Sequence, residues 1–249
     1  MTVQITISVE GAQRGLRAAL ASLPESYRIV SDARDADVVV VDGGTPWATR
    51  TRALLAAGRT TVLIVDPDRF DADLIGELRQ IAASAGSAVE VIRGWASDPA
   101  VEPFSDAVRD AVSPIMADST MICDASGDVD RAQREHLDLV AAALGAPLEI
   151  LDDQRVEGSR VVTAQAARDG ASLLVVCCTV AMPGVEAEAT VRLLTESGRL
   201  LLRLRSPDSA RPAQSLIGDA DGEVIAPYVY ESAYRAVLRR LRASIPAGT

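Results

Sequence analysis

The feature that most constrains this fold is a regular alternation of short apolar runs with amphipathic segments over the first 93 residues. The apolar runs are rich in valine and isoleucine, while the segments between them repeat apolar residues at helical spacing. Strands that alternate with helices imply right-handed crossovers and a parallel, Rossmann-like sheet. The predicted strands cover 3–9, 27–32, 36–42, 60–66 and 88–93. Helices are predicted over 13–23 and 72–85, and a turn followed by a helix that ends at a glycine is predicted over 43–58.

The pattern changes beyond about residue 113, where long strand-like runs are separated by glycine turns. Such runs favour a mainly antiparallel sheet. We therefore expect an α/β chain with two domains: a truncated Rossmann-like domain over 1–113, and an α+β domain with a largely antiparallel open sheet over 114–249. The other expected elements are a loop at 95–103, a strand at 119–125, and helices at 104–112, 130–145 and 231–245.

Composition excludes several classes of function. The formal net charge of −10 argues against binding to nucleic acid or to an anionic membrane. No basic and apolar leader and no apolar run of about 20 residues is present, so we expect a cytoplasmic protein. All 25 basic residues are arginines, which removes every lysine-dependent mechanism, including Schiff-base chemistry.

No metal site is expected. Cys177 and Cys178 are neighbours on a predicted strand, so their side chains point to opposite faces and suit neither a disulfide nor a metal clip. The stretch DASGDVD (124–130) alternates its acidic residues as a calcium loop does, but it lacks the closing glutamate in register. We expect it to form a helix-capping turn.

The turn after the first predicted strand lacks the glycine pattern of a dinucleotide site. That pattern is G-x-G-x-x-G, with an acidic residue about 20 positions later. Here Gly11 and Gly15 lie four residues apart, and Glu10 places a negative charge where a pyrophosphate would bind. Asp32 follows the second predicted strand, where a ribose-binding acid would lie. Gly11 and Asp32 are the candidates that remain for cofactor binding.

The stretch VLIVDPD (62–68) ends a buried strand in two aspartates, at the sheet edge where such folds bind ligands. The neighbouring strand ends carry the turn DGGTPW and an arginine with a tryptophan. Glycines let a ligand approach the backbone at a helix N-terminus, but the turn and both tryptophans fit ordinary structural roles as well. The candidate ligand-binding residues are Gly43, Gly44, Thr45, Trp47, Asp66, Arg93 and Trp95.

The order and lengths of the elements in 36–91 resemble those of the Gfo/Idh/MocA oxidoreductases. The similar features include a Thr-Pro turn at Pro46 and a strand that ends in x-x-Pro at Pro67. HLDLVAAALGAP (136–147) is similar to the segment that begins the family's C-terminal domain. The resemblance covers about 1–150 by pattern, and the later strands by architecture. It implies NAD(P) bound on the Rossmann domain, oxidation of sugars or cyclitols, and pairing of subunits through the open sheet.

The chain departs from the family at the sheet edge. The family has Glu-Lys-Pro where this chain has Val65, Asp66 and Pro67. The resemblance implies that the lysine contacts the cofactor and helps to relay the proton of the substrate hydroxyl. An aspartate there disfavours the alkoxide that precedes hydride loss. The family also has a helix and another strand within the region of 28–41, so part of the adenosine-binding half is missing here.

The predicted helix at 130–145 departs from the family as well. The family places an aspartate and a histidine four residues apart before its Leu-Asp pair. Aligned without gaps on Leu137, this chain has Arg131 and Glu135 at those positions. His136, the only histidine, is offset by one residue, which is a turn of about 100° on a helix.

Three interpretations remain open. The first is a non-catalytic pseudo-oxidoreductase, without a cofactor of its own, that acts as a partner or scaffold subunit of an active NAD(P)-dependent dehydrogenase. It would form a homo- or hetero-oligomer, such as a dimer, through the C-terminal sheet, with a full-length paralogue as one candidate partner. The second is an NAD(P)-dependent oxidoreductase of a sugar or cyclitol that uses Asp66, Glu135 or His136 instead of the missing groups. The third is a small-molecule binding module with its pocket at the sheet edge.

Overall fold

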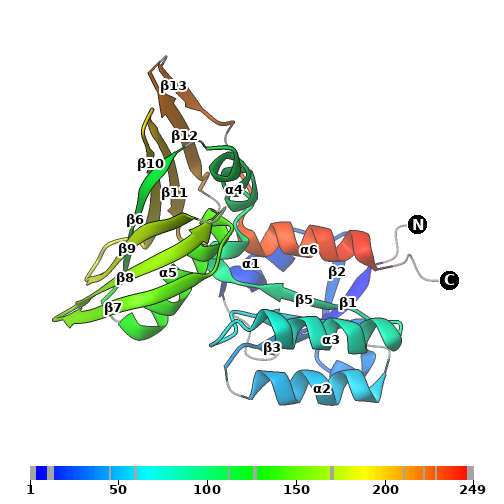
Figure 1. The fold of residues 1–249 in the computed structure, drawn as a ribbon. Helices are drawn as coiled ribbons and strands as arrows, with labels where there is room; N and C mark the ends of the chain where they lie inside the picture. The colour runs from blue at the N-terminus through cyan, green and yellow to red at the C-terminus, as the bar shows by residue number, and fades with distance from the viewer. Residues whose placement is uncertain are drawn as a thin grey trace. The chain divides into compact units, whose positions relative to one another are not determined.

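In a computed structural model, the described residues form two compact units (Figure 1). Unit 1 comprises described residues within 1–94 and 233–249, and unit 2 comprises those within 95–232. The structure describes residues 4–9, 14–44, 46–58, 61–111, 113–125, 128–168, 171–209, 211–220, 222–227 and 229–245.

Unit 1 is the Rossmann-like unit that the alternating pattern predicted. Its five strands are all parallel, in the order β2-β1-β3-β4-β5. Its elements are β1 (Ile5–Ser8), α1 (Arg14–Ala21), β2 (Tyr27–Val30), η1 (Ala33–Asp35), β3 (Val38–Asp42), α2 (Trp47–Ala57), β4 (Thr61–Val65), α3 (Ala72–Ser84), β5 (Val89–Ile92) and α6 (Ala233–Ser244).

Both faces of this sheet are covered by helices, which explains the continuous apolar runs of β3 and β4. Strand β4 is buried along its whole length, and Val38 to Val41 of β3 are all at most 3% exposed. One hydrophobic cluster joins β1 and β3 to α1 and α6, and another joins β3 and β4 to α2 and α3 (Figure 1). Because β3, β4 and β5 are parallel neighbours, their carboxyl ends lie at the same edge of the sheet.

The sheet ends at β2, as expected from the short connection between the second and third strands. Residues 31–37 are all described, and they form only the 3-10 turn η1 between β2 and β3. On the face of β1 opposite α1 and α6, Thr6 is tied to Asp37: the Thr6 N–H donates to Asp37 Oδ2 at 2.7 Å. The contact ties β1 to the residue that precedes β3.

Unit 2 is an eight-stranded sheet with helices on one face. The order is β13-β12-β11-β10-β6-β9-β8-β7, and every pair is antiparallel except β6 with β9. Its elements are η2 (Gly94–Ser97, whose first residue lies in unit 1), α4 (Val101–Asp110), β6 (Pro114–Asp124), α5 (Val129–Leu144), β7 (Leu148–Val156), β8 (Ser159–Arg168), β9 (Ala171–Met182), β10 (Glu188–Thr195), β11 (Arg199–Arg205), β12 (Gln214–Asp219) and β13 (Gly222–Ile225).

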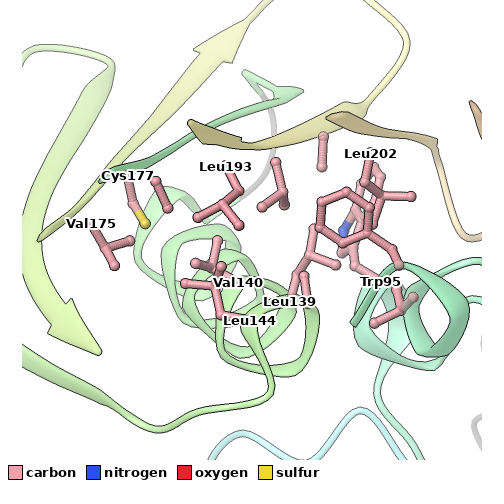
Figure 2. Packing of buried hydrophobic residues seen from close by; sticks show 14 of the residues in the cluster. Trp95, Leu139, Val140, Leu144, Val175, Cys177, Leu193 and Leu202 are labelled. Carbon is pink, nitrogen blue, oxygen red and sulfur yellow. The ribbon is translucent and has the colours of Figure 1, made fainter. Parts of the chain in front are cut away.

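The core of unit 2 lies between this sheet and the helices α4 and α5. Figure 2 shows side chains of α5 pointing toward alternate residues of the strands. Because strand side chains alternate between faces, only every second residue of each strand enters this core. The labelled members of the cluster are Trp95, Leu139, Val140, Leu144, Val175, Cys177, Leu193 and Leu202.

The observed units differ from the expected boundary at residue 113 in two places. Helix α4 begins at Val101, inside the expected loop, and its buried Phe104 packs into the core of unit 2. Pro103 is tolerated there because the first turn of a helix needs no N–H donor. Helix α6 belongs to unit 1, where the hydroxyl of Tyr27 donates to the carbonyl of Leu238 at 2.6 Å. Both differences come from tertiary packing, which local periodicity does not encode.

The carboxylate of Asp98 precedes α4 and accepts a hydrogen bond from the Ala100 N–H at 2.9 Å. Burial raises the pKa of Asp98 to about 6, although this hydrogen bond lowers it. The raised pKa means that the fold favours the protonated acid, so this group's contribution to stability is present below pH 4 and is lost as the pH rises through 6. Asp98→Asn keeps an acceptor and removes the charge. We expect it to raise the free energy of unfolding at pH 7.5 by about 2 kcal/mol.

The measurement is denaturant unfolding followed by the fluorescence of Trp95, in a Trp47→Phe background that leaves Trp95 as the only tryptophan. The gain from Asp98→Asn should disappear below pH 4, where the wild-type carboxyl is already neutral. A gain of the same size at pH 3.5 and pH 7.5 would show that charge burial is not its cause.

Candidate functional site

Asp66 lies directly after β4, at the shared edge of the parallel sheet in unit 1. Its backbone has a φ of +47°, a conformation that residues other than glycine rarely adopt. Its N–H donates to the Ile92 carbonyl at 2.8 Å. Its carboxylate accepts from the Gly94 N–H at 2.6 Å and from the Tyr234 hydroxyl at 3.2 Å. One side chain therefore connects the end of β4 to the end of β5 and to α6.

The glycine turn after β3, which contains Gly43 and Gly44, packs directly against the backbone of Asp66. The Gly43 N–H donates to the Val65 carbonyl at 2.7 Å, and the Asp68 N–H donates to the Gly43 carbonyl at 2.9 Å. A Cβ atom at Gly43 would lie 2.2 Å from the carbonyl oxygen of Asp66. Gly44 has more room, and its N–H donates to the Asp42 carboxylate at 2.9 Å. Gly43 is thus required by the close approach of two backbones.

The other described candidates for a ligand pocket, Trp47, Arg93 and Trp95, make separate structural contacts. Trp47 is 7% exposed and packs in the core beneath α2 and α3, whereas Trp95 is 5% exposed and packs in the core of unit 2. The Arg93 guanidinium lies 4.2 Å from the centre of the Phe70 ring, close enough for a cation–π interaction. Thr45 lies outside the described residues.

Of the two candidates for cofactor binding, only Asp32 lies within the described residues. Asp32 is exposed and caps η1, because its carboxylate accepts from the Arg34 N–H at 2.8 Å. Gly11 lies outside the described residues.

The predicted positions on α5 hold an ion pair. The Nε atom of Arg131 lies 2.9 Å from Oε1 of Glu135, one helical turn away, and both side chains are partly exposed. Pairs of this spacing contribute only about 0.3–0.5 kcal/mol to a helix. The carboxylate of Glu135 is thus occupied by an ion pair with an arginine of the same helix.

His136 is completely buried in the core of unit 2, so its side chain is not exposed as the candidate catalytic role would require. Its Nε2 lies 2.6 Å from Ser119 Oγ, and its Nδ1 lies 2.8 Å from Thr179 Oγ1. The Ser119 hydroxyl donates to the Thr190 carbonyl at 2.7 Å, so it must accept from the imidazole. The ring is therefore protonated on Nε2 and accepts at Nδ1 from the Thr179 hydroxyl. Burial lowers the pKa of His136 to about 3, so the ring is neutral.

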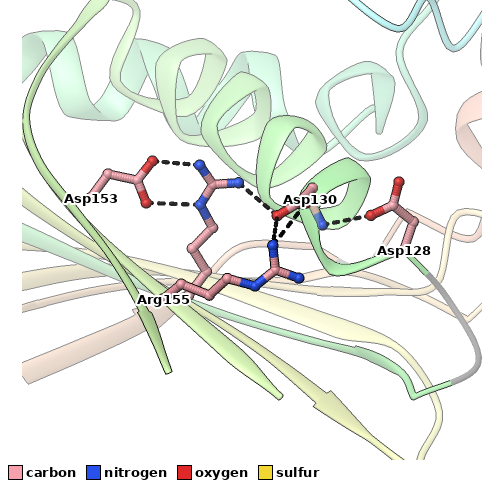
Figure 3. A network of polar contacts seen from close by, with 5 residues as sticks. Asp128, Asp130, Asp153 and Arg155 are labelled. Carbon is pink, nitrogen blue, oxygen red and sulfur yellow. Dashed lines mark hydrogen bonds and ion pairs between the residues drawn. The ribbon is translucent and has the colours of Figure 1, made fainter. Parts of the chain in front are cut away.

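A charged network at the start of α5 was not predicted from the sequence (Figure 3). Arg160 of β8 donates from Nε to Asp153 at 2.8 Å and from Nη1 to Asp130 at 2.8 Å. Arg155 also donates to Asp130, at 3.1 Å. Asp128 caps α5, as the helix-capping turn predicted, because it accepts from the Asp130 N–H. The network connects the β7–β8 hairpin to α5. No local sequence pattern brings these arginines and aspartates together, so the network becomes visible only in the folded chain.

The described part of the chain contains no metal-ligand cluster and no helix suited to span a membrane. No group of three or more His, Cys, Asp or Glu side chains there could hold a metal ion. Cys177 is buried and Cys178 is partly exposed on the opposite face, and neither is in a disulfide. None of the described helices has the length and apolar character needed to cross a membrane.

No protein-family model matches the sequence, and the comparison with curated proteins found no match. Solved structures are similar in fold. An oxidoreductase from Sinorhizobium meliloti has a TM-score of 0.69 at 13% identity, over 99% of this chain and 91% of that one. KijD10, a 3-ketoreductase from Actinomadura kijaniata in complex with NADP, has a TM-score of 0.67 at 16% identity, over 97% and 89%. This chain has the Gfo/Idh/MocA two-domain fold.

A third structure with this fold is a putative myo-inositol dehydrogenase from Sinorhizobium meliloti 1021. Its TM-score is 0.64 at 15% identity, over 99% of this chain and 90% of that one. At such identities the similarity establishes the Gfo/Idh/MocA fold alone, because one fold hosts many functions. Function has to be argued from the residues that occupy the positions of the site.

Proposed function

We propose that this chain is a non-catalytic pseudo-oxidoreductase that serves as a partner or scaffold subunit of an active NAD(P)-dependent dehydrogenase. The observation that carries the proposal is the environment of Asp66. Where the resemblance places a lysine, this chain has a carboxylate that accepts hydrogen bonds from Gly94 and from Tyr234, which is only 2% exposed. The position holds the fold together and carries the wrong charge to stabilise an alkoxide.

The helix α5 supports the same interpretation. Glu135, at the position of the family's histidine, is paired with Arg131, and the one histidine of the chain is sealed in the core with both nitrogens hydrogen-bonded. A general base must reach the proton that it abstracts and must titrate near the working pH. His136 meets neither condition, since it is 0% exposed and its pKa is about 3.

The residues present do not fit a bound NAD(P). The sheet ends at β2, and Asp32, the one acid placed for a ribose, uses its carboxylate to cap η1. The sequence also lacks the glycine fingerprint and any lysine. We therefore assign no cofactor and no reaction step to this chain, and we propose that its contribution is made through an interface on the face of the unit 2 sheet that lies opposite α4 and α5.

A cofactor titration tests the loss of binding. NADH and NADPH at millimolar concentration should leave the tryptophan fluorescence and the melting temperature of the purified chain unchanged. An active dehydrogenase of the Gfo/Idh/MocA type, measured in the same assay, provides the positive control. A saturable quench or a rise in melting temperature with either nucleotide would contradict the proposal and would favour an oxidoreductase with substituted catalytic residues.

The partner role is tested by co-purification with a full-length dehydrogenase from the same cell. We expect a stable complex, and we expect the turnover or stability of the dehydrogenase to fall when this chain is removed. Activity that stays the same with and without this chain would count against the role.

A further inference from the structure

The chain passes between the two units at two places. The first crossing lies between Gly94, which belongs to unit 1, and Trp95, the first residue of unit 2. The second crossing lies between Ser232 and Ala233, where the chain returns to unit 1. Hinge motions of a two-unit chain are absorbed by a few residues at such crossings. Contacts that fix the crossings therefore limit how freely the units can move.

The first crossing has almost no free backbone. Gly94 is buried, and its N–H donates to Oδ1 of Asp66 at 2.6 Å. The preceding residue, Arg93, is held by its guanidinium over the Phe70 ring. The following residue, Trp95, is 5% exposed and packs in the core of unit 2. Two adjacent residues are thus anchored in different units, and only the bonds that join them remain free to turn.

The second crossing is fastened to the same carboxylate. Ala233 and Tyr234, the first two residues after this crossing, are 1% and 2% exposed. Tyr234 packs in the hydrophobic cluster that joins α6 to α1, β1 and β3. Its hydroxyl donates to Oδ2 of Asp66 at 3.2 Å. Asp66 therefore holds one residue from each crossing, Gly94 through one oxygen and Tyr234 through the other.

The backbone of Asp66 is itself held in place, so its carboxylate can serve as an anchor. The Asp66 N–H donates to the Ile92 carbonyl at 2.8 Å. On the other side, the turn at Gly43 lies so close to the Asp66 carbonyl that it leaves no room for a Cβ atom. A charged acceptor also forms stronger hydrogen bonds than a neutral one. The two crossings are thus joined to a fixed point of unit 1.

We propose that Asp66 is a latch that fastens both crossings to one point of unit 1 and confines the hinge of the first crossing to Gly94 and Trp95. Loss of the carboxylate would free the first crossing back to Ile92, and it would release the hydroxyl of Tyr234 at the second. The latch goes beyond the proposed function, because it requires neither a cofactor nor a partner and can be tested on the chain alone.

Cleavage by trypsin tests the first crossing. Trypsin cleaves after lysine or arginine, and this chain contains no lysine. The bond after Arg93 lies at the first crossing, so we expect the native wild type to resist cleavage there. Asp66→Gly should be cut at this bond roughly tenfold faster or more, because hydrogen bonds to a charged acceptor are lost and local opening becomes easier. Glycine accepts the positive φ of this position, so the substitution removes the carboxylate without straining the backbone.

Hydrogen exchange of the Gly94 amide, followed by NMR, tests whether the two crossings share the latch. Tyr234→Phe removes only the hydroxyl, and it should speed exchange at Gly94 because the carboxylate of Asp66 is then free to rotate. When Tyr234→Phe is added to Asp66→Gly, exchange at Gly94 should not change further, because the shared carboxylate is already absent. Such non-additivity is the signature of residues that act through a common partner.

Two further variants serve as controls. Asp66→Asn keeps an acceptor for the Gly94 N–H and tolerates a positive φ, so it should retain most of the protection at Gly94. Asp42→Ala removes a carboxylate at the end of the neighbouring strand β3, where it accepts from the Gly44 N–H at 2.9 Å. This matched control should leave both the cleavage after Arg93 and the exchange at Gly94 unchanged.

Unchanged fluorescence of Trp47 and Trp95 would confirm that both units of each variant fold. Equal rates of cleavage after Arg93 in the wild type and in Asp66→Gly would overturn the inference. Effects of the two substitutions on Gly94 exchange that simply add would also overturn it, because the crossings would then be held independently. Neither measurement involves NAD(P) or a dehydrogenase, so its outcome is separate from the tests of the proposed function.

Discussion

Replacing Gly43 with alanine is expected to unfold unit 1 while unit 2 stays folded. The added Cβ would lie 2.2 Å from the Asp66 carbonyl oxygen and 2.3 Å from the Pro67 Cα. Both are backbone atoms, so relief requires the turn after β3 to separate from the end of β4. Overpacking of this kind costs about 3 kcal/mol or more. It would also break the hydrogen bonds that Gly43 exchanges with Val65 and Asp68.

The two tryptophans allow the units to be followed separately, because Trp47 is buried in unit 1 and Trp95 in unit 2. Gly43→Ala is measured by Trp47 fluorescence in a Trp95→Phe background, and by Trp95 in the reverse background. Gly44→Ala is the matched control: its Cβ would lie 3.1 Å from a side-chain oxygen of Asp42, which can turn away. Equal losses of stability from the two alanine variants would show that the close approach at Gly43 is not decisive.

Unit 2 is expected to lose stability steeply in mild acid, and His136 should account for most of the slope. The histidine has a pKa near 6.5 in an unfolded chain and about 3 in the buried core, so the unfolded chain binds the extra proton. Stability is therefore fully present above pH 6.5 and falls as the pH decreases toward 3. The expected loss is on the order of 4 kcal/mol between pH 6.5 and pH 3.5.

The comparison is the free energy of unfolding against pH for the wild type and for His136→Gln, followed by Trp95 fluorescence. The variant should be less stable at pH 7, because it cannot reproduce both imidazole hydrogen bonds, but its curve should be flatter from pH 6.5 to pH 3.5. Asp98 works in the opposite direction over part of this range, since its raised pKa favours the folded state at lower pH. Parallel curves for the two proteins would contradict the assignment to His136.

The sequence was sufficient to predict the strands and helices of unit 1, but not the contacts that Asp66 and Gly43 make at the carboxyl ends of β3 and β4. The alternating apolar runs predicted the parallel sheet, because a strand that is buried on both faces consists almost entirely of apolar residues. The role of Asp66 could not be predicted, because its partner Tyr234 lies 168 residues away. Gly43 resembled a residue of an anion-binding loop, and only the approach of Asp66 and Pro67 reveals why a side chain is excluded.

In unit 2 the sequence shows that His136 is displaced by one residue, about 100° on a helix, from the position of the family's histidine. Its burial in the core is known only from the fold. The Arg160 network was not predictable in the same way. It depends on a hairpin and a helix meeting at Asp130, and no local pattern in the sequence encodes that meeting.

The return of α6 to unit 1 affects the order in which the molecule can form during synthesis. Tyr234, Val237, Leu238 and Leu241 complete the hydrophobic cluster that begins with Ile5 and Leu16. The ribosome must therefore deliver the whole of unit 2 before the first strands can be sealed. Nascent chains usually fold from the N-terminus onward. Here unit 2 is inserted within unit 1 and can fold first. The core of unit 1 stays incomplete, and accessible to chaperones, until translation has passed residue 241.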